Sequence, residues 1–580
     1  MRYLTQSGKD FAEAHPESAR ALNLDDGLEK DPMVERLFEG FAFLSARLRQ
    51  KIDDDLPELT QSVLGLLWPH YLKPLPSLMV VRLGLNQNVV SNVQSIPAGV
   101  VLKTHAATPT TMACEFRTTL PVVVYPLAVV AAGLKHNEQG QSVIQLSLSL
   151  IHADNGQALQ LPESLPLTFF LDAEPSVKYA LHWALTNHVQ SISLSQQGQP
   201  LPASDLAFAP THWADESLSW ASFTDGMAHK DYAMLMEYFA FKEKFLFVSL
   251  SGLKAAHFQA QNQTLTVDCV LSKNFPAAGQ FDEQAFKLFC VPAINLFTLE
   301  AEPILKNQLS VDYKLTPMHH FQEQIEVYGV SSVESFSDAA TQRKVYQPLS
   351  QFRHHADRWR GTQSQKTQPF YYAHTQANVA GGQDMYVTLS DEQAPLTAKE
   401  VLSIRLLGTN GQLPKAAIHH DRRLSLQTPL VGIGSVEAVT MPTPILYPPK
   451  VDRAQWQLLF EMSHNYLSVL DKEVLKNSLR LANWSDAVSN ERNIDAIMAL
   501  AHEVKNVMRQ GLMVRCLVVT VTLDVKGYVN EGEAVLFGHL LHHFFSRHAE
   551  LNLMTQLVLH IHPSGRVYEW PIQAQDRMAF

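Results

Sequence analysis

Cysteine is scarce in this 580-residue chain. Only four are present, Cys114, Cys269, Cys290 and Cys516, and they lie far apart with no C-x-x-C pair. This spacing excludes the disulfide framework of a small secreted protein. We expect all four to be reduced residues of a hydrophobic core.

Long hydrophobic runs are also absent. The longest uncharged apolar stretch covers the 15 residues 120–134 and is interrupted by Pro121 and Pro126, whereas a membrane-spanning helix needs about 20 apolar residues. We therefore expect paired strands there and no direct membrane insertion. The N-terminus has no apolar segment of the kind found in secretory signal peptides, so the chain is predicted to stay in the cytoplasm.

An excess of positive charge is missing as well. The chain carries 46 Lys and Arg residues against 57 Asp and Glu residues, a formal net charge of −11, with a pI of about 6.1. No global positive field is available to hold a polyanion, so nucleic acid is not expected as a partner. Gly and Pro are not enriched, which indicates a globular chain, and its length allows about three to five domains.

What is present begins with a helical pattern near the N-terminus. Asp31 and Pro32 form a helix start signal, because Asp caps free backbone amides and Pro suits the first helical position. Apolar residues then recur at steps of three and four, which is typical of an amphipathic helix. This N-terminal stripe consists of Val34, Leu37, Phe38, Phe41, Leu44, Leu48 and Ile52. It is either a core helix of an N-terminal domain or one member of a bundle shared with other chains.

From residue 76 the pattern changes to short apolar runs separated by Pro, Gly and Asn, which predicts β structure. The runs cover residues 77–85, 100–103, 122–127 and 143–151, and another strand is expected at 165–171. A short helix is expected at 177–187, and a helix followed by a strand within 232–253.

The second half of the chain is mixed. The polar segment 337–383 is interpreted as a long exposed loop in its middle or as a domain edge. Strands are expected at 385–389, 401–407, 514–523 and, as the final strand, 557–562, with helices at 456–470 and 534–548. We therefore predict an α+β protein with four parts: a helical N-terminal segment (1–75), a large β-rich domain (76–335), a β-rich domain with a long polar loop (336–450) and an α+β C-terminal domain (451–580).

One pair of residues resembles a catalytic motif. His539 and His543 are four apart on the predicted helix, the spacing of a helical zinc pair. A zinc hydrolase of that kind has a glutamate after the first histidine, but Leu540 stands there. His560 and His562 share one face of the final strand and are candidate additional ligands; a partly exposed, packed helix face is the alternative. A metal-dependent hydrolase therefore stays a rival interpretation, beside a carbohydrate- or peptide-binding β protein.

Several blocks of sequence resemble those of a single family. They cover residues 11–16, 31–44, 56–60, 68–74, 237–245, 292–297 and 537–557. In their order along nearly the whole chain they resemble the TssF family, also called VasA or ImpG, a baseplate subunit of the bacterial type VI secretion system. One departure is Gly408, where a cysteine is expected before Thr409 and Asn410.

The resemblance implies a structural protein that is not an enzyme and has no catalytic, metal or cofactor site. Two copies are expected to join one TssG and to form a wedge with TssK and TssE. Six wedges would surround the VgrG spike hub and support the sheath and tube, docked near the inner membrane. The family is also similar to contractile-phage wedge proteins, where neighbouring chains share a helical bundle. In that setting the N-terminal stripe is expected to be an intersubunit interface.

Overall fold

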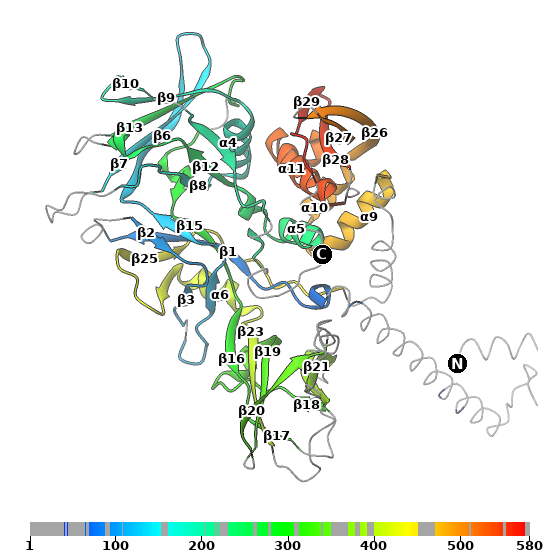
Figure 1. Ribbon diagram of the computed structural model, residues 1–580. Helices are drawn as coiled ribbons and strands as arrows, with labels where there is room; N and C mark the ends of the chain where they lie inside the picture. The colour runs from blue at the N-terminus through cyan, green and yellow to red at the C-terminus, as the bar shows by residue number, and fades with distance from the viewer. Residues whose placement is uncertain are drawn as a thin grey trace, which may run out of the picture. The chain divides into compact units, whose positions relative to one another are not determined.

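The computed structural model divides the chain into two compact units, Met1–Leu72 with Pro449–Phe460, and Lys73–Pro448 with Glu461–Phe580. The structure describes residues 40, 43, 64, 69–86, 93–106, 108–151, 161–202, 205–214, 217–219, 230–258, 264–276, 280–306, 312–337, 340–349, 369–377, 383–390, 400–449, 470–509, 512–548 and 553–574. Nearly all of these belong to the second unit, whose elements are labelled in Figure 1.

Six strands from distant stretches of the sequence close into a barrel. Their order is β1 (Leu78–Leu85), β15 (Cys290–Ile294), β4 (Glu115–Thr118), β3 (Val101–Thr104), β24 (Arg423–Leu426) and β25 (Ile433–Ala438). β1 is antiparallel to both neighbours, with Leu78 opposite Ile294 and Val81 opposite Ala438. The strands predicted at 77–85 and 100–103 are confirmed, and a short helix, α6 (Leu413–His420), precedes β24.

Two further sheets are built mainly from residues 127–288. One has the order β10 (Gln199–Leu201), β9 (Val189–Gln196), β13 (Leu265–Leu271), β7 (Ser142–Leu150) and β6 (Leu127–His136). The other has the order β11 (Ala207–Pro210), β12 (Phe247–Ser251), β8 (Leu167–Leu171) and β14 (Phe286–Leu288), and a separate pair joins β2 (Gln94–Ile96) to β5 (Val122–Val124). The apolar stretch 120–134 thus forms strands as predicted, but β5 and β6 pair with β2 and β7 instead of with each other.

The two predicted helices of this region are confirmed. α4 (Pro175–Asn187) begins with a proline, which loses no hydrogen bond at that position. α5 (Lys230–Ala240) leads through the 3-10 turn η4 (Lys242–Phe245) into β12, which is the expected order of helix and strand.

Eight strands between residues 297 and 409 form a third sheet. The order is β16 (Phe297–Glu300), β23 (Glu400–Thr409), β19 (Glu326–Ser337), β20 (Ala340–Pro348), β21 (Phe370–Ala377), β22 (Gln383–Ser390) and β18 (Asp312–Lys314), with β17 (Ile304–Lys306) beside β23. β20 and β21 lie within the polar segment 337–383, so its two flanks are strands. The middle, residues 350–368, where the loop is expected, lies outside the described residues.

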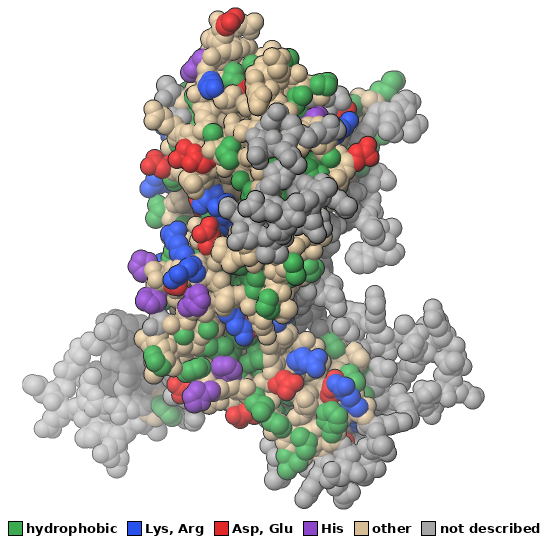
Figure 2. Space-filling model, turned by 90° about the vertical axis from the view of Figure 1, so that its left-hand side faces the viewer, with side chains coloured by type: hydrophobic (Ala, Val, Ile, Leu, Met, Phe, Trp, Pro, Cys, Tyr) green, Lys and Arg blue, Asp and Glu red, His purple; other side chains and the backbone are tan. Residues whose placement is uncertain are grey.

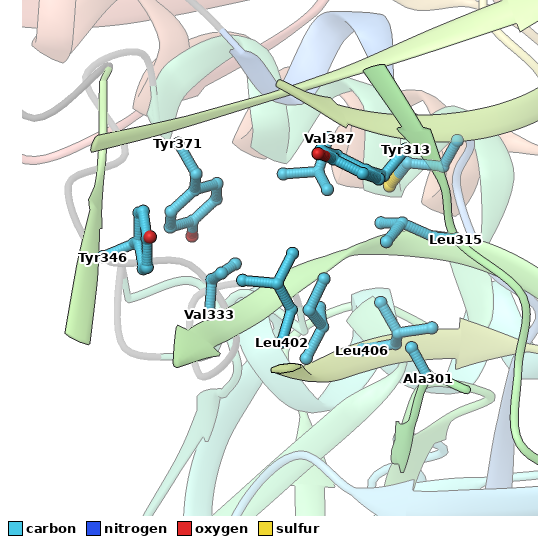
Figure 3. Close-up of a cluster of buried hydrophobic side chains, with 11 residues drawn as sticks. Ala301, Tyr313, Leu315, Val333, Tyr346, Tyr371, Val387, Leu402 and Leu406 are labelled. Carbon is cyan, nitrogen blue, oxygen red and sulfur yellow. The ribbon is translucent and has the colours of Figure 1, made fainter. Parts of the chain in front are cut away.

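This eight-stranded sheet folds over its own hydrophobic core. The buried members are Ala301, Tyr313, Leu315, Val333, Tyr346, Tyr371, Met385, Val387, Leu402, Ile404 and Leu406. Figure 3 shows Tyr313 and Val387 on one side of the cluster and Leu402 and Leu406 on the other. Because β18 and β22 lie at one end of the strand order and β23 near the other, the sheet must curl to bring these side chains together.

The C-terminal region is α+β. It contains α9 (Lys472–Ala482), α10 (Val488–Asp495) and α11 (Glu531–His548), and the sheet β26 (Ile497–Arg509), β27 (Leu512–Asp524), β28 (Met554–His562) and β29 (Arg566–Glu569). β27 and β28 are parallel, with α11 as the crossover packed on β28. The predicted strands and helix are confirmed, but β28 is not the last strand, because a turn at Ser564 and Gly565 returns the chain into β29. The helix predicted at 456–470 lies outside the described residues.

These elements confirm the α+β class with a β-rich middle and a mixed C-terminal region. In the N-terminal segment, the described residues Gly40, Phe43 and Leu64 have helical backbone. The four-part division at residues 75, 335 and 450 remains a prediction; β19 crosses the expected border between residues 335 and 336.

Removing side-chain volume from the core of the eight-stranded sheet should destabilise the protein. Leu402→Ala is expected to lower the free energy of unfolding by about 2–5 kcal/mol, because a buried leucine leaves a cavity. Val401→Ala is the matched control, since Val401 is the preceding residue of β23 and is 42% exposed. Urea unfolding of both variants measures the difference; equal losses would contradict the core assignment.

Candidate functional site

The N-terminal stripe, which is the interface predicted from the sequence, lies outside the described residues. Close to it, the structure describes Phe43, which has helical backbone and is 64% exposed. A helix turns by about 100° per residue, so Phe43 belongs to the side of the helix away from the stripe. The stripe therefore remains a predicted interface.

α11 carries the two histidines that resemble a zinc pair. The ring centroids of His539 and His543 are 5.1 Å apart, and the His542 ring lies 5.7 Å from that of His543. The Trp213 ring lies 4.5 Å from His539 and stacks on His543 at 5.3 Å. Trp570 Nε1 donates a hydrogen bond of 2.8 Å to His539 Nδ1. The imidazole rings are therefore packed among aromatic side chains.

The described histidines of α11 do not form a metal site. Among the described residues, no group of three or more His, Cys, Asp or Glu side chains is arranged to hold a metal ion. On β28, His560 and His562 alternate with the buried Leu559 and Ile561, and Leu559 is the side chain that faces α11. The two strand histidines thus point away from α11. The metal-hydrolase interpretation has no support in this part of the chain.

Burial keeps His539, His542 and His543 neutral. Desolvation lowers the pKa of His542 to about 4 and the pKa of His543 to about 3. It also lowers the pKa of His539 well below 6.5, with a further contribution from His543. His542 is only 2% exposed, and neither of its ring nitrogens has a hydrogen-bond partner among the described residues. His539 and His543 are partly exposed, as the packed helix face given as the alternative to a metal site requires, whereas His542 is a core residue.

A buried ion pair lies beside α11. The ammonium group of Lys244 in η4 contacts the carboxylate of Glu237 in α5, and both side chains are completely buried. The other carboxylate oxygen of Glu237 accepts a hydrogen bond of 2.6 Å from the Ser219 amide. Burial lowers the pKa of Lys244, and Glu237 opposes that shift. Each charge needs its partner, because an unpaired charge in a protein interior is strongly unfavourable.

A second ion pair joins three segments of the chain. Lys242 Nζ lies 2.9 Å from Glu533 Oε1, near the start of α11. Asn493 Nδ2 in α10 donates to the same oxygen at 3.2 Å, and the Val529 amide donates to Glu533 Oε2 at 2.8 Å. The Tyr528 hydroxyl donates to the Asn493 carbonyl at 2.8 Å. This Glu533 cluster connects η4, α10 and α11.

A third buried network joins the barrel to the eight-stranded sheet. Asn295 Oδ1 accepts hydrogen bonds from the Thr409 hydroxyl and the Asn410 amide, both at 2.8 Å. Asn295 Nδ2 donates to the Glu115 carbonyl at 2.8 Å and to Asn410 Oδ1 at 2.9 Å. Glu115 begins β4 of the barrel and Thr409 ends β23 of the sheet. One completely buried side chain therefore fixes the place where the two sheets meet.

The glycine that departs from the family pattern has a steric reason. A Cβ atom at Gly408 would lie 2.7 Å from Leu299 Cδ2 and 3.1 Å from Ile325 Cγ2. These two apolar side chains occupy the volume that a cysteine would need, so a larger residue requires them to shift.

One pocket on the described surface lies at the start of α11. It has a volume of 420 Å³ and is lined by residues that include Trp183, Lys273 and Arg566. Two of its charged groups pair with each other, since Arg566 Nη1 lies 2.5 Å from Glu531 Oε2, and the Tyr568 hydroxyl donates to Glu531 Oε1 at 2.6 Å. On the face drawn in Figure 2, Lys and Arg side chains lie among Asp and Glu side chains. Within the described residues, no helix has the length and apolar character needed to cross a membrane.

Sequence reasoning missed the buried charges. It used residues 237–245 to predict a helix followed by a strand and as a family block, although Glu237, Lys242 and Lys244 are ion-pair residues. A signal was available, because charges within a run of Tyr, Phe and Ala are buried only when they are paired. No local signal joins Asn295 to Asn410, which are 115 residues apart in the sequence.

Breaking the fully buried ion pair should cost more than removing it. Lys244→Met leaves the Glu237 carboxylate unpaired and is expected to lower the free energy of unfolding by about 3–5 kcal/mol. The double variant Glu237→Gln/Lys244→Met removes both charges and keeps an acceptor for Ser219, so it should recover part of that loss. Urea unfolding compares the two; a double variant less stable than Lys244→Met would contradict the pairing.

The buried histidines should make the fold sensitive to acid. Between pH 6.5, where the unfolded histidine titrates, and about pH 4, the unfolded chain binds more protons, so the free energy of unfolding falls as the pH falls. Each such group contributes a slope of at most about 1.4 kcal/mol per pH unit. His542→Phe removes one group and should flatten the pH dependence, because phenylalanine does not titrate. Urea midpoints of the parent chain and the variant between about pH 7.5 and about pH 5 measure this; parallel curves for the two proteins would refute it.

Comparison with known proteins identifies relatives along the whole chain. A family model described as "Type VI secretion system, TssF" matches residues 1–577. The type VI secretion system component TssF1 of Pseudomonas aeruginosa is 27% identical over 619 aligned residues, which cover 100% of this chain and 98% of that protein.

Two solved structures are similar over the same length. A chain of the TssK-TssF-TssG baseplate subcomplex of a type VI secretion system, determined by cryo-electron microscopy, is 35% identical, with a TM-score of 0.81 and coverage of 94% of this chain and 99% of its own. A chain of the baseplate complex of the type VI secretion system is 31% identical, with a TM-score of 0.66 and coverage of 100% and 98%. The protein therefore belongs to the TssF family of type VI secretion system baseplate components.

Proposed function

We propose that this chain is a structural subunit of a type VI secretion baseplate and assembles with TssG and TssK. The observation that carries the proposal is the similarity to a chain of the TssK-TssF-TssG subcomplex, with a TM-score of 0.81 at 35% identity. The match covers 94% of this chain and 99% of that chain. The similarity therefore extends over nearly the whole of both proteins and is not limited to one shared domain.

The further partners are proposed on the family resemblance. They are TssE, the VgrG spike hub and the sheath and tube components, with two copies of this chain for each TssG. A location in the cytoplasm near the inner membrane belongs to the same proposal. The net charge of −11 fits a protein whose partners are proteins and not nucleic acid.

A non-enzymatic role is also part of the proposal. The support comes from His539 and His543, the residues that most resemble a catalytic pair. Both are packed against Trp213 and kept neutral by burial. The pocket beside α11 contains polar groups that pair with one another. In these two places the side chains are occupied in packing and hydrogen bonds, which stabilises a fold.

The mechanism we propose is conformational. A baseplate has to hold a metastable assembly and release it when triggered, so its subunit contacts should have two packed arrangements. The rigid parts of this chain are the regions tied together by the Glu533 cluster and by Asn295. The N-terminal stripe is then the segment that contacts neighbouring chains, as a helix of a shared bundle.

A charge placed on the stripe should prevent assembly. Phe38→Asp or Phe41→Asp is expected to abolish the complex with the TssG-like protein of the same bacterium, because the carboxylate would be buried in an apolar seam. The second unit of the chain should remain folded. Native mass spectrometry of the co-expressed proteins measures the expected 2:1 complex.

Phe43→Asp is the matched control for this experiment. It makes the same substitution within the same segment, but at a position that is 64% exposed and off the stripe, so it should leave assembly intact. A complex that survives Phe38→Asp and Phe41→Asp would overturn the bundle assignment. A folded wild-type chain that does not bind the TssG-like protein would overturn the proposed function itself.

A further inference from the structure

β26 is a long outer strand with little of the chain around it. It forms one edge of the sheet β26-β27-β28-β29, and no described strand pairs with its outer side. Residues 501–506 are all exposed, so for six consecutive positions both faces of the strand are open. An unprotected edge of this kind presents a row of free backbone donors and acceptors to another chain.

The hairpin of β26 and β27 also exposes apolar side chains. Val504 is 46% exposed, and Met508 and Met513 are 73% and 71% exposed and lie directly opposite each other. Leu500, Val504 and Met508 share one face of β26, because they are separated by even steps. The end of the hairpin extends beyond β28, whose pairing with β27 starts only at Cys516. A two-stranded ribbon with an apolar face is marginal on its own, which favours a further strand beside it.

We propose that β26 pairs with β26 of a second copy of this chain, antiparallel and with Val504 on the two-fold axis. Antiparallel pairing of identical strands is a closed, two-fold contact. In this register Glu503 of each copy lies opposite Lys505 of the other, which makes two cross-strand ion pairs. The same register places Ala501 opposite Val507, Leu500 opposite Met508, His502 opposite Asn506 and Val504 opposite Val504.

The charges of β26 favour this register over its nearest neighbours. An axis on Glu503 would place two carboxylates opposite each other, and an axis between Glu503 and Val504 would leave each carboxylate opposite a valine. Opposite charges across a strand pair stabilise it and like charges destabilise it. Within one copy the Lys505 ammonium already contacts the Glu503 carboxylate, and both side chains are more than half exposed. In the pair of copies these side chains become one group of four alternating charges.

The charges also explain how such an edge avoids indiscriminate pairing. Natural edge strands carry Lys, Glu or bulges that discourage other strands, and β26 has both charges as well as an irregularity between Ile497 and Ala499. A strand of other sequence would leave Glu503 and Lys505 without partners, whereas a second copy matches both. The contact goes beyond the proposed baseplate role, which does not depend on it, so the two can fail separately.

Charge reversal provides the test. Glu503→Lys places lysines opposite each other in both cross-strand pairs, and Lys505→Glu does the same with glutamates, so each variant alone should dimerise at least about tenfold more weakly than the parent chain. Mixing the two variants restores both ion pairs, so a heterodimer should form. Glu473→Lys is the control, since it makes the same charge change on the exposed surface of α9. Native mass spectrometry of differently tagged full-length chains distinguishes these species.

A cysteine on the axis tests the register directly. Val504→Cys should form a disulfide-linked dimer on mild oxidation, because the two Val504 positions are directly opposite each other. Ala499→Cys should not, because Ala499 lies opposite Arg509 of the second copy. The four native cysteines are buried and do not interfere.

Two results would overturn the proposal. One is a failure of the mixed charge variants to associate more tightly than either variant alone; the other is equal cross-linking of Val504→Cys and Ala499→Cys. Association through the N-terminal stripe would not discriminate between these variants. The complex with the TssG-like protein, measured on the same samples, reports separately on the proposed function.

Discussion

The burial of charge is the constraint on which the packing of α5, α10 and α11 depends. Lys244 and Glu237 have no access to water, and Lys242 and Glu533 have almost none. A buried charge tolerates few arrangements, because its partner must lie at hydrogen-bond distance and in the right direction. Glu237 lies in α5 and Glu533 in α11, and Asn493 of α10 donates to Glu533, so these three helices are held in one arrangement around the aromatic and histidine side chains between them.

A similar constraint acts where the barrel meets the eight-stranded sheet. Asn295 makes four hydrogen bonds to residues from the barrel and from the end of β23. Because hydrogen bonds are directional, they fix both the position and the orientation of the two sheets at this contact. Hydrophobic contacts alone tolerate small shifts, since they have little directionality. Two of the sequence blocks that resemble the TssF family contain one side of these networks: residues 237–245 include Glu237, Lys242 and Lys244, and residues 292–297 include Asn295.

The features of the chain agree with a protein that works through its contacts. The residues closest to a catalytic arrangement, the histidines of α11, are neutral packing residues, and the pocket beside them has paired polar groups. The surfaces that we propose for partners are the N-terminal stripe predicted from the sequence and the exposed edge of β26. A rigid body with separate contact elements is what a subunit of a large assembly requires, because the contacts can rearrange while the body keeps its fold.

Sequence by itself determined many local elements: two strands of the barrel, β1 and β3, the helices α4, α5 and α11, and the α+β class, because hydrophobic periodicity and Pro signals act over a few residues. The sequence also indicated the family, because several blocks resemble those of TssF in the same order along the chain. Only the tertiary structure decided that Lys242 meets Glu533, 291 residues away, that polar residues 340–348 and 370–377 are strands, and that His542 is buried. The physical reason is that partners across such distances are set by the path of the whole chain, which no local pattern records.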